Sequence, residues 1–156
     1  MELSSTSITP YTAIHLKYCE RGAGGQNVSP ALSWSGAPAG TRSYAVTVFD
    51  PDAPTGSGWW HWIVYDIPAE AVELAEGGPL PDGAKQALND YGYRGYGGAC
   101  PPPGPPHRYV HTVYALGVDR LDADPDGSNA SVRFALMANV LDQASLTATF
   151  QNKASR

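Results

Sequence analysis

Residues 42–49 read Arg42-Ser43-Tyr44-Ala45-Val46-Thr47-Val48-Phe49 and predict a β-strand that is largely apolar on both faces. A strand of this kind is typical of the middle of a sheet that other elements cover on both sides. A second stretch has the same character, Tyr109-Val110-His111-Thr112-Val113-Tyr114-Ala115-Leu116. We therefore expect two central strands of one packed sheet.

Four more segments are rich in β-branched and aromatic residues and also predict strands. They are residues 13–18, 31–34, 60–67 and 146–150, and the second central strand is expected to span 109–118. Many Gly and Pro residues, 17 and 14 respectively, separate these segments and indicate a structure rich in turns.

One late segment, residues 131–143, predicts the only long helix. Apolar residues recur in it at helical spacing, and short polar residues before it could cap its N-terminus. The apolar residues are Val132, Ala135, Leu136, Val140 and Leu141, and the cap candidates are Asp126, Ser128, Asn129 and Ser131. The expected architecture is a mainly β, mostly antiparallel domain over residues 1–156 with one helix near the C-terminus.

The charge pattern limits the classes of partner. The chain has 10 basic and 15 acidic residues, a net charge of −5 and an isoelectric point near 5.2, with no basic run. Nucleic acid and a polybasic hold on a membrane are therefore not expected. Residues 1–7 lack the pattern of a secretory signal and no apolar run could span a bilayer, so we expect a cytoplasmic protein with Cys19 and Cys100 as free thiols.

Polar clusters lie where the strongest strands end or begin. Asp50-Pro51-Asp52-Ala53-Pro54 follows the first central strand, Trp59-Trp60-His61-Trp62 comes shortly afterwards, and His107-Arg108-Tyr109 opens the second. Two carboxylates and two imidazoles could thus converge on one ligand cleft. The plainer alternative makes Asp-Pro-Asp a turn held by local backbone hydrogen bonds, and the tryptophans, His61 and above all His111 core residues.

Four ordered motifs give a resemblance to a known family. Residues 25–34 (GQNVSPALSW), Asp50-Pro51-Asp52-Ala53-Pro54, Gly58-Trp59-Trp60-His61-Trp62 and the segment from Pro101-Pro102 to His107-Arg108-Tyr109 resemble the phosphatidylethanolamine-binding proteins. The Trp-Trp-His-Trp and Gly-Ala-Cys-Pro-Pro forms are similar to the bacterial, Raf kinase inhibitor-like branch. The loop Pro103-Gly104-Pro105-Pro106 is one residue shorter than the common bacterial form.

The resemblance implies an antiparallel, Greek-key-type β-sandwich and a metal-free pocket for phosphate or a phosphoethanolamine headgroup. It implies a non-enzymatic binding and regulatory protein without a cofactor, a modulator of a kinase or protease, and a homodimer, as for some bacterial relatives. It also implies a cis peptide bond at Ala53–Pro54. By motif position the pocket residues are Asp50, Asp52, His61, Pro101, His107 and Tyr109, with Trp59, Tyr96 and Arg108 beside them.

Carboxylates that face a phosphate need compensation by positive charge or protons. We expect His61 and His107 to become imidazolium ions beside an Asp, Arg108 to neutralise one carboxylate, and backbone N–H groups of Gly97–Gly98 to add donors. A zwitterionic ligand would also place its ammonium against Asp50 or Asp52. Binding should then weaken as pH rises through the imidazole range.

Two rival functions remain open. Two His and two Asp would also suit a metal-dependent hydrolase, although neither His-x-x-x-His nor Cys-x-x-Cys spacing occurs. Cys100 has no predicted base partner, and no Gly-x-Ser-x-Gly elbow exists for a covalent hydrolase. The third reading is an interaction module that inhibits a protein partner through its surface.

Overall fold

The two segments predicted as central strands lie side by side in a five-stranded antiparallel sheet. The structure is a computed structural model that describes residues 1–153. The order of strands in this sheet is β6 (Lys85–Gln86), β4 (Trp59–Pro68), β3 (Ser43–Asp50), β7 (His107–Leu116) and β8 (Val140–Phe150). A second antiparallel sheet has the order β1 (Glu2–Ser4), β2 (Leu32–Ser35) and β5 (Glu73–Leu74).

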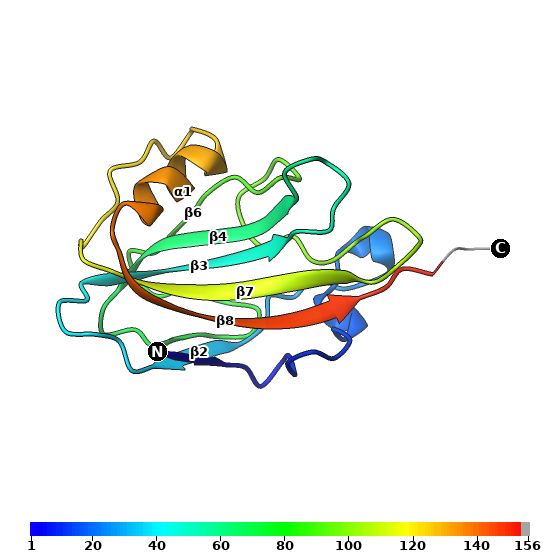
Figure 1. The fold of residues 1–156 in the computed structure, drawn as a ribbon, viewed down its shortest axis with the longest axis horizontal. Helices are drawn as coiled ribbons and strands as arrows, with labels where there is room; N and C mark the ends of the chain where they lie inside the picture. Colours follow the sequence, from blue (N-terminus) through cyan, green and yellow to red (C-terminus); the bar gives the residue numbers. More distant parts are fainter. Residues whose placement is uncertain (154–156) are drawn as a thin grey trace.

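The large sheet is covered on both faces, as the apolar pattern of residues 42–49 predicted. On one face Tyr44, Val46 and Val48 of β3 pack with Leu32 and Trp34 of the small sheet. On the other face Ala45 belongs to a cluster with Ile63 of β4 and with Val132 and Leu136 of helix α1 (Asn129–Met137). Figure 1 shows the resulting layers, with α1 above the large sheet and β1–β2 below it.

The antiparallel order places three polar segments at one end of the large sheet. The end of β3 pairs with the start of β4, where Asp50 is opposite Trp59, and with the start of β7, where Phe49 is opposite Val110. Residues that follow β3 therefore meet residues that open β4 and β7. This end is the right-hand side of Figure 1.

The strand predicted over residues 13–18 is wrong. Only Ala13 forms a bridge, to Thr149, and the chain then enters a short 3₁₀-helix, η1 (Leu16–Tyr18). The His15 side chain caps this helix, because its Nδ1 accepts a hydrogen bond from the backbone N–H of Lys17 at 3.1 Å. A local side-chain cap therefore overrides the β propensity of these residues. A second 3₁₀-helix, η2 (Arg21–Ala23), follows.

The late helix is shorter than predicted. It begins after Ser128, one of the expected caps, whose side chain accepts from the N–H of Ser131. It ends at Met137, where Asn139 bonds back to Leu136 and Ala135. Residues from Val140 onward join β8 instead, because pairing with β7 satisfies their backbone groups. The prediction that Val140 and Leu141 belong to the helix is therefore wrong.

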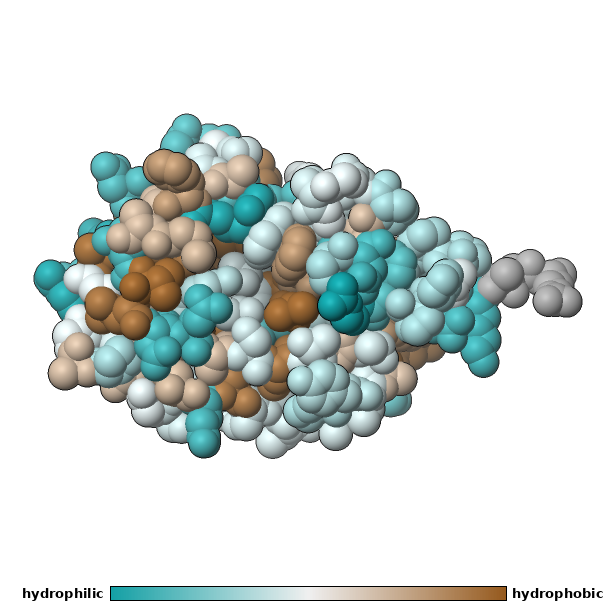
Figure 2. Space-filling model, viewed as in Figure 1, coloured by the Kyte–Doolittle hydropathy of each residue, from teal (hydrophilic) through white to brown (hydrophobic). Residues whose placement is uncertain are grey.

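Exposed apolar side chains gather around helix α1. Phe134, Met137 and Leu141 are exposed, and Figure 2 shows brown and tan atoms over α1 and the start of β8. Of the helices in the described residues, none is long and apolar enough to cross a membrane.

Candidate functional site

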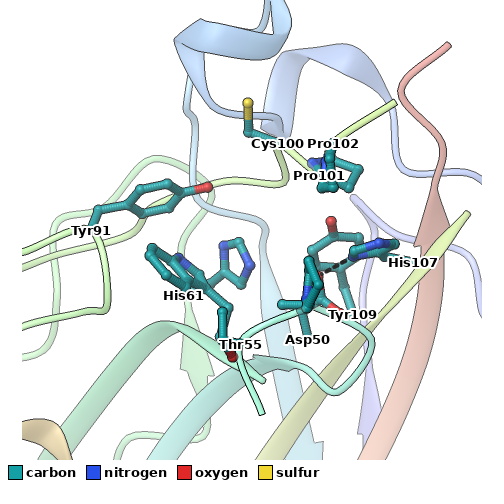
Figure 3. A pocket seen from close by; sticks show the side chains of 12 residues that line it. Asp50, Thr55, His61, Tyr91, Cys100, Pro101, Pro102, His107 and Tyr109 are labelled. Atoms are coloured by element: carbon teal, nitrogen blue, oxygen red, sulfur yellow. Dashed lines mark hydrogen bonds and ion pairs between the residues drawn. The ribbon is translucent and has the colours of Figure 1, made fainter. Parts of the chain in front are cut away.

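A cavity of about 210 Å³ opens at the end of the large sheet where β3, β4 and β7 meet. Its walls come from segments that are far apart in the sequence, and Figure 3 shows their side chains turned toward one space. The sheet supplies Asp50, Trp59, His61, His107 and Tyr109, and the connecting loops supply Ala53, Pro54, Thr55, Tyr91, Cys100, Pro101 and Pro102. The convergence expected from the sequence is therefore present for one carboxylate and two imidazoles.

Asp50 and His107 form a buried acid–base pair on one side of the cavity. Nδ1 of His107 lies 2.6 Å from Oδ2 of Asp50, and the side chains are 9% and 3% exposed. The other carboxylate oxygen accepts the backbone N–H of Asp52 at 2.7 Å. Both oxygens of Asp50 are therefore engaged, and Nδ1 of His107 carries the proton of their hydrogen bond.

His61 is held differently, by a backbone carbonyl. Its Nδ1 lies 2.7 Å from the carbonyl oxygen of Gly97, and its ring is buried. Burial lowers the pKa of His61 because the charged ring would lose its hydration, and the Gly97 carbonyl and Asp50 oppose this only in part. This direction is opposite to the one expected for an imidazolium ion, and Asp50, the expected partner of His61, is bonded to His107 instead.

Two hydrogen-bond donors at the cavity have no partner among the residues described. They are the hydroxyl group of Tyr109 and the indole Nε1–H of Trp59, both inaccessible to solvent. Burial, and then the nearby charge of Asp50, raise the pKa of Tyr109, so its hydroxyl keeps its proton. Buried donors normally find an acceptor, because leaving one unpaired costs about 1–3 kcal/mol.

Asp52 and Arg108 lie beside the cavity and do not line it. The guanidinium of Arg108 binds both carboxylate oxygens of Asp52 at 2.8 and 3.0 Å, and its backbone N–H donates to the same carboxylate. The hydrogen bonds to Arg108 lower the pKa of Asp52 to about 2. The prediction that Arg108 neutralises one carboxylate is confirmed.

Tyr96 also lies outside the cavity lining. Its hydroxyl donates to the carbonyl of Tyr18 at 2.7 Å, and its ring packs edge-on against Trp62. Its role in the structure is therefore to join η1 to the sheet. Pro101, by contrast, lines the cavity as expected.

Two further expectations about the loops are wrong. The N–H groups of Gly97 and Gly98 are not free donors, because they bond to the carbonyl of His61 and to Oδ1 of Asn27. The Ala53–Pro54 bond is trans, whereas Gly78–Pro79 is cis. Hydrogen bonds from Thr55 to Ala53 and Gly58 close that turn around the trans bond, which is the lower-energy form.

The sequence reasoning missed Tyr91 and Thr55 as cavity residues. The Tyr91 ring packs edge-on against Trp59 and His61, at centroid distances of 5.4 and 5.6 Å, and its hydroxyl donates to the Gly98 carbonyl. Asn89 fixes the turn, since its side chain accepts the N–H of Tyr91 at 2.9 Å. An Asn followed two residues later by an aromatic was the available signal.

One free thiol lines the cavity, and one further histidine lies in the core behind it. Burial raises the pKa of the Cys100 thiol, and the Glu20 carboxylate adds to this effect, so the reactive thiolate is disfavoured. His111, the other expected core histidine, is buried with Nδ1 on the Tyr109 carbonyl, and burial lowers its pKa to about 4. Within residues 1–153, no group of three or more His, Cys, Asp or Glu residues is arranged to hold a metal ion.

Comparisons with known proteins show which sequences the chain resembles. The family model for phosphatidylethanolamine-binding protein matches residues 4–151. The UPF0098 protein YbcL of Escherichia coli (strain K12) is 50% identical over 85% of this chain and 76% of its own length. The UPF0098 protein YbhB of the same organism is 48% identical over 83% of this chain and 85% of its own.

Solved structures show the same likeness. The crystal structure of E. coli YbcL, described as a new member of the mammalian PEBP family, has a TM-score of 0.93 at 45% identity, over 97% of this chain and 98% of that one. The carboxypeptidase Y inhibitor, solved with its cognate proteinase, shares only the fold, with a TM-score of 0.59 and 19% identity over 97% and 83% of the two chains. From its sequence, its fold and the site just described, the chain belongs to the phosphatidylethanolamine-binding protein family.

Proposed function

We propose that the cavity binds a small phosphate-type oxyanion, either inorganic phosphate or the phosphate end of a molecule such as phosphoethanolamine. The observation that carries this proposal is the convergence of Asp50, His61, His107 and Tyr109 on one cavity, where the Asp50 carboxylate is hydrogen-bonded to His107. A cavity of about 210 Å³ has room for a small oxyanion.

The charges around the cavity support an anion as the ligand. The Asp50 carboxylate is bonded to His107 and the Asp52 carboxylate to Arg108, so neither stands alone. Their repulsion of an anion is thus reduced, which answers the apparent conflict between acidic residues and a phosphate. Nε2 of His107 makes no hydrogen bond to the described residues, and His107 lines the cavity.

An ammonium group on the ligand has a different place from the one the sequence suggested. Both carboxylates already accept hydrogen bonds from the protein. The aromatic rings of Trp59 and Tyr91 form the opposite wall and can receive an alkylammonium group through cation–π contacts. The proposal is therefore that phosphate recognition dominates, and that the amine adds a smaller increment.

We propose binding without catalysis. The lining has a Cys100 whose thiolate is disfavoured and a Thr55 whose hydroxyl donates to the Gly58 carbonyl. Neither is paired with a base in the manner of a covalent hydrolase. Incubation with a chromogenic phosphomonoester should release no product above the buffer rate, and turnover that the Tyr109→Phe variant loses would contradict the proposal.

Calorimetric titration with phosphate tests the binding directly. Affinity is expected to be modest, since the ligand has few atoms. Tyr109→Phe removes only the unpartnered hydroxyl, so it should weaken phosphate binding roughly tenfold and leave the fold intact. Tyr114→Phe is the matched control, because Tyr114 is buried in the core beneath α1. Absence of phosphate binding to the wild-type protein would overturn the proposal.

A homodimer, a cytoplasmic location and a modulating role toward a protein target stay predictions. Light scattering coupled to gel filtration measures the first, and cell fractionation the second. For the third, a partner captured by the wild-type protein but not by the Tyr109→Phe variant would tie the modulating role to the cavity.

A further inference from the structure

An open groove of about 370 Å³ lies along β5, at the outer edge of the small sheet. Its lining comes from residues 70–73, Ala75 and residues 79–81. None of these residues lines the cavity at the end of the large sheet. The groove is therefore a separate feature, and its volume is within the range of sites that hold a ligand or the side chains of a peptide.

The turn that follows β5 makes the second wall of this groove. The N–H of Gly78 donates to the Ala75 carbonyl at 3.0 Å, and the N–H of Gly77 donates to the Ser29 carbonyl at 2.9 Å. Both glycines have positive φ angles, 73° at Gly77 and 80° at Gly78, which other residues adopt only with strain. The chain is thereby turned back, and residues 79–81 line the groove together with the strand.

The edge of β5 leaves backbone groups free to pair. The N–H of Trp34 donates to the Val72 carbonyl at 2.9 Å, and Leu74 is opposite Leu32 of β2. Backbone groups alternate in direction along an antiparallel strand, so those of Glu73, between Val72 and Leu74, point away from β2. Within residues 1–153, β5 is the last strand of its sheet and nothing pairs with it on that side. An extended segment can therefore add to this edge.

The side chains of the groove combine an apolar surface with negative charge. Val72 is 48% exposed, and Pro79 and Leu80 line the groove with it. Glu70 and Glu73 are exposed in the same lining, and neither forms an ion pair with another residue in the range 1–153. Charge complementarity therefore favours a cationic partner, and the apolar surface favours one that also buries an aliphatic side chain.

We propose that this groove binds an extended segment of a partner protein in which apolar residues alternate with lysine or arginine. The segment pairs its backbone with that of Glu73. Since successive side chains of a strand point to opposite faces, its apolar residues contact Val72 and Leu80 while its cationic residues approach Glu73, with Glu70 adding to the attraction. Backbone pairing supplies affinity for any extended chain, and the side chains supply the selectivity. This binding does not involve the cavity and does not depend on the function proposed above.

A peptide titration followed by NMR of the amide groups tests the proposal on the wild-type protein. The probe is a capped hexapeptide of alternating lysine and valine. It should shift the amide signals of residues 70–75 and leave those of His61 and Tyr109 in place. The same peptide with glutamate instead of lysine should bind at least about tenfold more weakly. No binding of the lysine peptide, or shifts only at other surfaces, would overturn the proposal.

Backbone pairing is tested by a lysine–valine hexapeptide with methylated backbone nitrogens. This peptide keeps its side chains and its charge but has no N–H to donate to the Glu73 carbonyl. Its affinity should fall at least about tenfold if strand addition supplies the binding. An affinity equal to that of the unmethylated peptide would show that charge alone attracts the probe, and would contradict the proposed mode.

Two variants separate the groove from the general negative charge of the protein. Glu73→Lys should weaken binding of the lysine–valine peptide roughly tenfold, because it reverses the charge beside the pairing position. Asp122→Lys is the matched control, since Asp122 is exposed, outside the groove lining, and gives the same change in net charge. Val72→Thr keeps the shape of the side chain and should weaken binding several-fold. Equal weakening by Glu73→Lys and Asp122→Lys would overturn the assignment of the groove.

Discussion

Two acid–base pairs, Asp50 with His107 and Asp52 with Arg108, come from the same two short segments and have opposite surroundings. The first pair is almost fully buried and lines the cavity, whereas Arg108 is 59% and Asp52 30% exposed. His107 and Arg108 are adjacent in β7, so alternation turns their side chains to opposite faces, and Asp50 ends β3 whereas Asp52 lies in the turn that follows. The buried pair, Asp50 and His107, therefore lines the cavity. The outer pair, Asp52 and Arg108, joins the turn after β3 to the start of β7 beside the cavity.

The largest expected effect comes from breaking the buried pair. Asp50→Ala leaves Nδ1 of His107 and the backbone N–H of Asp52 without their acceptor. Loss of one partner from a buried pair should lower the free energy of unfolding by about 3 kcal/mol, measured by urea denaturation. Asp52→Ala is the matched substitution at the exposed pair, and we expect a much smaller loss. Equal losses would contradict the distinction between the two pairs.

An intermediate effect should separate binding from stability. In His107→Asn the amide nitrogen can replace Nδ1 as the donor to Asp50, but nothing replaces Nε2 at the cavity. Phosphate affinity should fall roughly tenfold while the unfolding free energy stays within about 1 kcal/mol of the wild type. The comparison variant, Arg108→Ala, should bind phosphate nearly as the wild type does. The opposite ranking, measured by calorimetry, would place the anion at the outer pair.

The smallest effect is the pH dependence of the outer pair. Since the folded-state pKa of Asp52 is about 2, below its value in the unfolded chain, its contribution to stability is present above pH 4 and is lost as pH falls toward 2. The difference in unfolding free energy between the wild type and Asp52→Asn should shrink over that range. Added salt should shrink it too, because the pair is exposed. A difference that grows on acidification would contradict this account.

The central strands could be predicted from sequence because burial on both faces leaves a continuous apolar pattern, as in Tyr44, Val46 and Val48. The end of the helix could not, since Val140 and Leu141 fit helical spacing as well as they fit β8. Pairing with β7 places these two residues in a strand, and a local sequence pattern does not encode a contact between distant segments.

The site shows the same division. Motifs located Asp50, His61, His107 and Tyr109, because strand ends and proline-rich turns mark where side chains can meet. The partners of each group depended on distances in the fold. The sequence could not show that Asp50 bonds to His107 and leaves His61 to the Gly97 carbonyl. Tyr91 enters the cavity only through a turn that the fold brings beside β4.

The most direct test of the central claim is a crystal structure of the protein with phosphate at a saturating concentration. The account predicts the anion in the cavity, in contact with lining residues such as His107 and Tyr109. Phosphate bound only at other surfaces, with the cavity empty, would contradict it.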